Sequence, residues 1–377
     1  MARLSGVENV QRRRFALRIG LLVASPLVFL VVLELVLRAT GFVHMPPIVP
    51  MMVWNPVEDP ALRSGTGLFI GDRAQLWVPR PGATPHWAPD ERINAAGYRG
   101  PELPLERTPG VVRIAALGDS STFGLEVRAE EAWPAQLAAE LESRGMRAEV
   151  LNAGVVGYTV RQGIERYLAL VRPYRPDVVV AAFGAFNDHV AAKGLPDDEK
   201  IAQRKAYSGL ARVRDRLRVE LRVLHLAGLV AERLSGFDRD AMRVELNKQR
   251  RAQSKLEPVM GRVDFAGLRR VAPDRFAECL RELDALVRAD GAKLVLVAMP
   301  RHPEKEQSAP VLLEYDTRVY SVGKELGVPV FDFKKMVAEN IAMGRKWEDL
   351  FRDHFHPNPR GHVMFAKGLV HQVLPVL

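Results

Sequence analysis

The sequence predicts an α/β fold: a three-layer α/β/α sandwich around a central parallel sheet of five strands. Short apolar runs rich in β-branched residues alternate with helical patterns from residue 111 onward, and strands separated by helices form parallel sheets covered on both faces. The first three runs end in small or polar residues, as is typical of the functional edge of such sheets. The five strands are expected at 111–117, 148–151, 177–183, 293–298 and 328–332.

The helices follow from apolar spacing and from the position of proline. Trp133-Pro134 places a proline early in a helix, where its missing N–H removes no hydrogen bond. In 273–290 apolar residues recur on one helix face with Cys279 among them, so we expect this thiol to be buried in packing. The helices are expected at about 133–143, 160–170, 273–290, 311–326 and 359–373.

Composition bounds the class of protein. The 377 residues, of which 47% are hydrophobic, suffice for one large core or for two domains, and the single cysteine excludes an internal disulfide. Most of the net charge of +9 comes from one segment, because residues 193–270 contain 19 Lys and Arg against 11 Asp and Glu. No recognition motif accompanies these charges, so we expect no nucleic-acid partner; a solvated or lipid-facing insertion explains them.

The N-terminal segment predicts a membrane anchor. Residues 1–14 are polar and contain four arginines, whereas 15–37 are mostly apolar and would form about 34 Å of helix. Because arginines crowd the N-terminal side, we expect 1–14 in the cytoplasm and the rest outside it, in the periplasm or an equivalent compartment. A cleaved signal peptide is the alternative, although 39–41 is a poor cleavage site.

The remaining chain divides into two predicted parts. Residues 38–110, rich in Pro and Gly, are interpreted as a stalk and a covering segment, and 111–377 as the main domain with an insertion at about 189–262. We favour a helix in this insertion that packs on the domain with a charged outer face; a lid or a membrane-surface helix is the alternative. Its apolar residues at helical spacing are Leu210, Val213, Leu217, Leu221 and Leu224.

Four short motifs carry the candidate chemistry. Ser120, in Gly118-Asp119-Ser120 after the first strand, is a candidate nucleophile, and the alternative is a helix-capping turn. A serine hydroxyl needs an adjacent base, for which His356 is the best candidate, and Asp353 can reach the same face of a turn to orient the imidazole. The other motifs are Asn152-Ala153-Gly154, Gly184-Ala185-Phe186-Asn187-Asp188 and Asp353-His354-Phe355-His356.

In this order the motifs resemble those of the SGNH (GDSL-type) esterase and lipase superfamily, in particular its membrane-anchored bacterial members. The resemblance extends from about residue 113 to the C-terminus apart from the insertion, and it implies a flavodoxin-like fold. Residues 94–100 look like a stretch that precedes the catalytic domain in membrane-anchored members. One departure is an additional residue between Gly184 and Asn187, which leaves the shape of that loop open.

The resemblance implies roles for individual residues. Ser120, His356 and Asp353 would form a catalytic triad, and the N–H groups of Ser120 and Gly154 with the Asn187 amide would form the oxyanion hole. A glycine lets the backbone approach a substrate, and the asparagine amide offers two donors. Asp119 and Asp188 are expected to brace their loops.

The predicted function is a serine esterase or acylhydrolase, lipase-like in class, that cleaves O-acyl carboxylic esters outside the cytoplasm through an acyl-enzyme. Two alternatives stay open: an O-acyltransferase that passes the acyl group to a glycan, and a non-catalytic envelope binding or assembly protein. The substrate would be an acyl ester, with acylated glycans and lipids among the candidates.

No cofactor and no metal ion are expected. The alternative is a zinc site around Asp353, His354, His356 and His362, which we disfavour because His356 already has a role as a base. His302, after the fourth strand, is interpreted as a loop histidine.

Overall fold

The computed structural model describes two compact parts of the chain. The described residues are 18, 22, 24–42, 44, 68–189, 196–206, 210, 213, 217, 221–236 and 269–377. One unit comprises Met1–Pro46 with Ser208–Asp238, and the other comprises Pro47–Tyr207 with Arg239–Leu377. The second unit contains the predicted sheet and every candidate site residue, so the site is described within it.

The five-stranded parallel sheet predicted from the sequence is confirmed. Its strands lie in the order β4-β3-β5-β6-β7, which places the first strand of the sheet between the second and the third. This is the flavodoxin-like order, and ligands bind where the strand order reverses, beside the carboxyl ends of the central strands. The strands are β3 (Val112–Gly118), β4 (Ala148–Asn152), β5 (Val178–Ala182), β6 (Lys293–Ala298) and β7 (Val330–Asp332).

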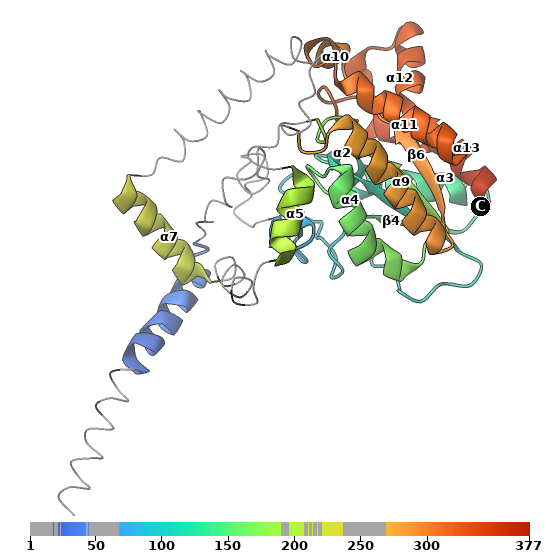
Figure 1. Ribbon diagram of the computed structural model, residues 1–377. Helices are drawn as coiled ribbons and strands as arrows, with labels where there is room; N and C mark the ends of the chain where they lie inside the picture. The colour runs from blue at the N-terminus through green and yellow to red at the C-terminus, as the bar shows by residue number, and fades with distance from the viewer. Residues whose placement is uncertain are drawn as a thin grey trace, which may run out of the picture. The chain divides into compact units, whose positions relative to one another are not determined.

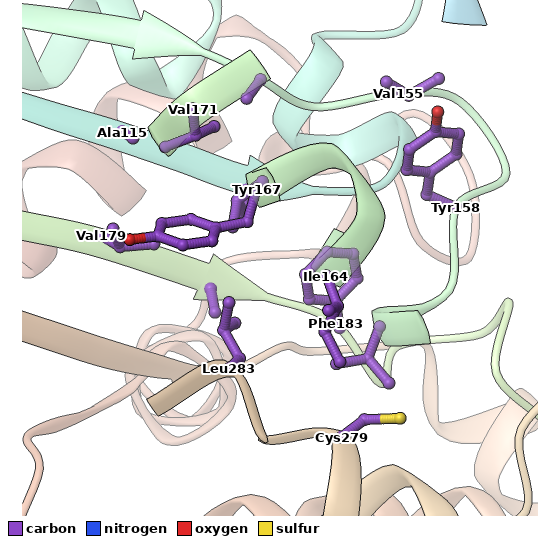
Figure 2. Close-up of a cluster of buried hydrophobic side chains, with 14 of the residues drawn as sticks. Ala115, Val155, Tyr158, Ile164, Tyr167, Val171, Val179, Phe183, Cys279 and Leu283 are labelled. Carbon is purple, nitrogen blue, oxygen red and sulfur yellow. The ribbon is translucent and has the colours of Figure 1, made fainter. Parts of the chain in front are cut away.

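Helices cover both faces of the sheet (Figure 1), because alternate strand residues point to opposite sides. One core contains Ala115 and Leu117 of β3 with α4 (Val160–Arg166), α9 (Pro273–Ala289) and α11 (Leu312–Leu326). Figure 2 shows part of this core, where Cys279 lies buried as predicted. The opposite core contains Ile114 and Ala116 with α3 (Trp133–Glu142), α12 (Phe333–Ala342) and α13 (Pro359–Val373).

Several boundaries and elements differ from the prediction. The helix expected at 160–170 ends earlier as an α-helix, and a π turn (Tyr167–Val171) and a 3-10 turn (Arg172–Tyr174) continue the chain. The last strand begins at Val330, after Pro329, which has no N–H to donate. The unpredicted elements are β1 (Phe69–Asp72), β2 (Leu76–Pro79), α2 (Ser120–Phe123), α5 (Asp197–Ala206), α7 (Arg222–Ser235), α10 (Pro303–Ser308), α12, and 3-10 turns at Ala129–Glu131, Trp347–Asp349 and Leu374–Val376.

The described part of the covering segment is built into the main core. Strands β1 and β2 form an antiparallel hairpin whose Leu76 and Trp77 are buried. The Trp77 indole donates to the Val156 carbonyl at 3.0 Å, and the Arg166 guanidinium donates to the Gly97 carbonyl at 2.7 Å. These contacts join the covering segment to the loop after β4 and to α4.

A residue in the first part of the insertion contacts the N-terminus of α4. Thr159, the N-cap of α4, donates its hydroxyl to Asp197 at 2.9 Å, and Asp197 also pairs with Arg270 at 2.7 Å. Further along, residues 208–238 belong to the other unit, where the Val223 N–H donates to Glu34 at 2.9 Å. Of the five apolar residues of the predicted amphipathic segment, Leu221 is partly buried, whereas Leu210, Val213, Leu217 and Leu224 are exposed, so these four do not form the packed face that we expected. Most of the rest of the predicted insertion, 190–195 and 237–262 in particular, lies outside the described residues.

The N-terminal predictions fall partly outside the described residues as well. Residues 1–14 are not among them, and the predicted span 15–37 is described at Arg18, at Leu22 and from residue 24, all of it helical. Among the described residues, no helix combines the length and the apolar character needed to cross a membrane. Membrane anchorage by 15–37 therefore stays a prediction.

Candidate active site

Ser120 lies at the start of a short helix that follows the central strand. Strand β3 ends at Gly118, Asp119 caps helix α2 through the Ser121 N–H, and Ser120 is the first helical residue. The turn requires a glycine at 118, because a Cβ there would lie 2.0 Å from Thr122 Oγ1. Ser120 itself is 7% exposed. A helix does start at this turn, as the alternative reading expected, but its capping residue is Asp119 and not the serine. The role of Ser120 as a nucleophile stays a prediction.

The structure brings Ser120, His356 and Asp353 together in one hydrogen-bonded chain. Ser120 Oγ lies 2.7 Å from His356 Nε2, and His356 Nδ1 lies 2.7 Å from Asp353 Oδ2. An ionised carboxylate can only accept, so Nδ1 carries a proton, and Nε2 of the neutral ring is then free to accept the serine proton. This is the geometry that a serine nucleophile and its base require.

The turn that carries the base is braced by its own acid. Asp353 Oδ1 accepts the N–H groups of Phe355 and His356, each at 2.8 Å. Partial burial works to raise the pKa of Asp353, but the hydrogen bonds and charge of His356 outweigh it and hold this pKa well below its usual value. The carboxylate is therefore ionised at neutral pH and can stabilise an imidazolium.

Asn187 reaches the same region from the loop after β5. Its Nδ2 donates to Asp119 Oδ2 at 3.0 Å, which fixes the amide and uses one of its two N–H donors. Asp188 braces the loop by accepting from the Gly184 N–H at 3.2 Å and the Val160 N–H at 2.8 Å. Burial raises the pKa of Asp188 to about 7. Both aspartates have the bracing contacts predicted for them, and the additional loop residue does not separate Asn187 from the nucleophile turn.

Gly154 lies in the loop after β4, but its position has a different physical cause from the one the sequence suggested. A Cβ at this residue would lie 2.4 Å from the Phe123 N, so the glycine lets α2 pack closely. Its N–H donates to Asn152 Oδ1 at 3.1 Å.

The histidines near Asp353 do not form the zinc set considered from the sequence. His356 is held between Ser120 and Asp353, and the buried His362 accepts the Trp133 N–H at Nδ1, 3.2 Å away. Burial lowers the pKa of His362 to about 3, so this ring is neutral. His354 instead lies beside His302 and Glu304, in a group whose ligand atoms are all within 4.8 Å of one another.

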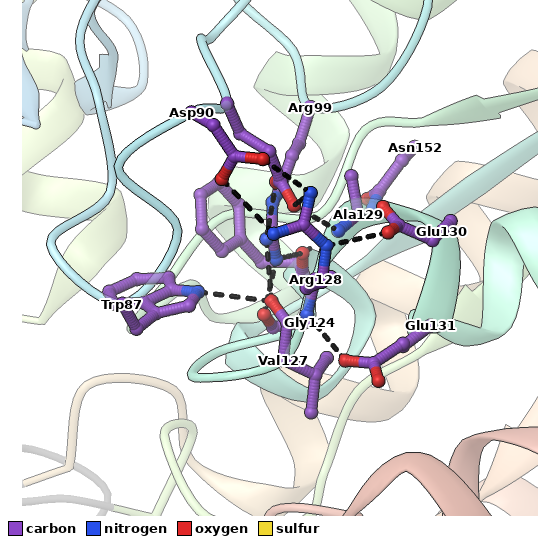
Figure 3. A network of polar contacts seen from close by, with 12 residues as sticks. Trp87, Asp90, Arg99, Gly124, Val127, Arg128, Ala129, Glu130, Glu131 and Asn152 are labelled. Atoms are coloured by element: carbon purple, nitrogen blue, oxygen red, sulfur yellow. Dashed lines mark hydrogen bonds and ion pairs between the residues drawn. The ribbon is translucent and has the colours of Figure 1, made fainter.

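Arg99 is a supporting residue that sequence reasoning did not identify, although it lies in the stretch 94–100. Its buried guanidinium donates to the carbonyls of Phe123 at 3.2 Å, of Val127 at 2.5 Å and of Gly124, and it pairs with Glu91 at 2.8 Å (Figure 3). Gly124 is the C-cap of α2. Arg99 therefore holds the end of the helix that begins with Ser120. The signal in the sequence was a single charged residue within the uncharged remainder of 94–100.

Comparison with known proteins then identifies the family. A sequence model described as the GDSL-like lipase/acylhydrolase family matches residues 116–364, which include all the candidate site residues. The chain belongs to this family. Membership of this family confirms the predicted enzyme class, which is a hydrolase acting on ester bonds.

Individual relatives cover less of the chain than the GDSL-like family model does. An arylesterase of Vibrio mimicus is 32% identical over 84 residues, which are 22% of this chain and 40% of the relative. A protein of Escherichia coli K12 named thioesterase 1/protease 1/lysophospholipase L1 is 37% identical over 71 residues, 19% of this chain and 33% of the relative. The chain therefore matches less than half the length of these curated relatives.

Two solved structures align with most of this chain at low sequence identity. A crystal structure of TesA covers 70% of this chain and 99% of its own, with 17% identity and a TM-score of 0.42. Axe2, an acetylxylan esterase from Geobacillus stearothermophilus, covers 70% of this chain and 94% of its own, with 17% identity and a TM-score of 0.43.

Proposed function

We propose that this protein is a serine esterase that cleaves O-acyl carboxylic esters through a Ser120-His356-Asp353 triad and an acyl-enzyme. The observation that carries the proposal is the unbroken chain from Ser120 Oγ through the imidazole to Asp353, with both links at 2.7 Å. A structural turn has no need of this arrangement, because Ser120 is not the capping residue and His356 does not support the core.

The chemistry proceeds in two steps. His356 Nε2 takes the Ser120 proton as Oγ attacks the ester carbonyl, and the resulting imidazolium is stabilised by the Asp353 carboxylate. The imidazolium then protonates the departing alcohol, which leaves an acyl group on Oγ. Water, deprotonated by the same imidazole, attacks the acyl carbonyl and releases the acid with Ser120 restored.

Three groups would donate hydrogen bonds to the oxyanion. The Ser120 N–H belongs to the first turn of α2, where N–H groups have no intrahelical acceptor. Asn187 supplies its second N–H, with the amide oriented by Asp119. The Gly154 N–H, the third predicted donor, is hydrogen bonded to Asn152 and would have to exchange this acceptor for the oxyanion.

We also propose that 15–37 anchors the chain in a membrane, with 1–14 in the cytoplasm and the hydrolase unit outside it. The support is the sequence alone: a mostly apolar run of 23 residues with arginines concentrated on its N-terminal side. A C-terminal reporter that is active only outside the cytoplasm should then be active, and the protein should stay with membranes after an alkaline wash. Release of a shortened soluble form would instead identify a cleaved signal.

Hydrolysis of model esters tests the proposed activity. The two curated relatives are named as an arylesterase and a thioesterase/lysophospholipase, so aryl esters, acyl thioesters and lysophospholipids are the first substrates to try. Each assay is run with water alone and with a glycan acceptor, because transfer to the acceptor would indicate an O-acyltransferase. Ser120→Ala and His356→Ala should each reduce turnover by orders of magnitude in a folded protein. Equal turnover in wild type and Ser120→Ala would refute the proposal.

A further inference from the structure

Two loops meet beside the proposed triad and bring two imidazoles and a carboxylate together. His302 and Glu304 lie at the start of α10, and His354 lies in the turn between Asp353 and His356. Glu304 Oε2 is 3.6 Å from His354 Nε2 and 3.8 Å from His302 Nδ1. This cluster is separate from the triad, since none of its ligand atoms takes part in the bonds between Ser120, His356 and Asp353.

We propose that His302, Glu304 and His354 form a binding site for a zinc-class divalent ion. Two imidazoles and one carboxylate, with a fourth position for water, are a common ligand set for zinc. Metal–ligand bonds of about 2.0–2.2 Å in a tetrahedron place neighbouring ligand atoms about 3.3 Å apart. The two separations that involve Glu304, 3.6 and 3.8 Å, exceed this value by a few tenths of an ångström, and all three ligand atoms lie within 4.8 Å of one another. Side-chain rotation can supply the remaining approach.

The two loops are already held at the required distance by other contacts. The His302 N–H donates to the His354 carbonyl at 2.9 Å. The Trp347 ring packs edge-on against the His302 ring, with centroids 5.3 Å apart, and its indole N–H donates to the Asp353 carbonyl at 2.6 Å. Such neighbours orient the ligands before the ion arrives, as outer contacts do in metal sites.

Zinc binding would break few existing contacts of the three ligands. His302 Nδ1 accepts the Glu304 N–H at 3.3 Å, which is longer than a normal hydrogen bond, so replacing this contact with a metal bond removes little. Glu304 is 73% exposed and His354 is 43% exposed, so the ion can enter from solvent. The imidazoles favour zinc over magnesium or calcium, which prefer oxygen ligands.

The site would connect the turn of Asp353 and His356 to the loop after β6. A bound ion would act as a clamp on this turn and would take no part in the acyl chemistry, because the serine and its base need no metal. The proposal therefore does not depend on the proposed esterase activity.

Calorimetric titration with zinc chloride tests the proposal. The full chain, purified in detergent, stripped with EDTA and free of any affinity tag, should bind zinc with a stoichiometry of one and should not bind magnesium. Bound zinc should raise the unfolding midpoint, increasingly with free zinc concentration. Glu304→Gln and His354→Gln should each weaken zinc binding at least about tenfold. His302→Asn should do the same and can still cap α10 through its side-chain oxygen.

The matched control is His371→Gln, which alters an exposed histidine of α13 and should leave zinc affinity unchanged. The midpoint of each variant is also measured without zinc, and Glu304→Gln, at an exposed position, keeps the test valid if a histidine variant is unstable. Absence of zinc binding by the wild type, or the same affinity in wild type and Glu304→Gln, would overturn the proposal.

Discussion

Replacing Arg99 with methionine should destabilise the hydrolase unit strongly. The change keeps an apolar stem but removes the guanidinium from the carbonyls of Phe123, Gly124 and Val127 and from Glu91. Breaking a buried ion pair by removing one partner costs about 3–5 kcal/mol, and each buried carbonyl left without a donor costs about 1–3 kcal/mol. The Val127 carbonyl keeps the Trp87 indole N–H at 3.0 Å and the Phe123 carbonyl keeps the Asn152 amide at 3.4 Å. The broken ion pair therefore dominates, and we expect a loss of about 3–5 kcal/mol in the free energy of unfolding.

The control lies in the same network (Figure 3). Arg128 pairs with Asp90 at 2.8 Å, but the two side chains are 43% and 63% exposed, so Arg128→Met should change the free energy of unfolding little. Denaturant unfolding of the wild type and both variants measures the differences in the free energy of unfolding. The comparison is valid when the three proteins show the same dependence of this free energy on denaturant concentration. Because Arg99 holds the end of α2, the methionine variant should also lose ester hydrolysis. If Arg99→Met is as stable and as active as Arg128→Met, residues 94–100 form only a surface turn and our assignment is wrong.

Further variants test other parts of the account. Asn187→Ala should lower kcat by about a hundred- to a thousand-fold, or about 2.7–4 kcal/mol, with little change in KM; normal turnover would remove it from the oxyanion hole. Asp353→Asn should lower kcat by about 10⁴ by favouring the wrong imidazole tautomer, and a loss below tenfold would contradict this role. The pKa of His362 falls from 6.5 to about 3 on folding, so its contribution to stability is complete above pH 6.5 and is lost as the pH falls toward 3. His362→Gln should therefore make acid destabilisation shallower by about 1.4 kcal/mol per pH unit in this window, and an unchanged slope would refute this assignment. EDTA should leave hydrolysis unchanged, and activity that is lost and then restored by zinc would make the metal catalytic.

The sheet and the proximity of Ser120, His356 and Asp353 could be predicted because the strands and the motifs that follow them have local signals. Apolar β-branched runs identify parallel strands, and the segments that follow them identify the functional edge. The pairing of Ser120 with His356, far apart in the sequence, was predictable from motif order because both the loop after β3 and the turn before α13 lie at that edge. The 2.7 Å contact agrees with that expectation.

Roles that depend on tertiary contacts could not be predicted in the same way. The reason for a glycine at 154 is its approach to α2, which no local pattern encodes. Arg99 donates to the carbonyls of Phe123 and Val127, which are more than twenty positions away, and such contacts leave no trace in the sequence. His302 and His354 lie in different loops. Predicting that they are close would have required knowing both the position of β6 in the sheet and the position of the turn that contains Asp353 and His356.

Covalent labelling of Ser120 tests the central claim most directly. A serine-reactive fluorophosphonate is incubated with wild type, Ser120→Ala and His356→Ala, and the labelled peptide is identified by mass spectrometry after proteolysis. The account predicts one adduct on Ser120 in the wild type, none in Ser120→Ala, and much slower labelling in His356→Ala because the hydroxyl has lost its base. An adduct on another residue, or equal labelling of wild type and Ser120→Ala, would contradict the assignment of Ser120 as the nucleophile.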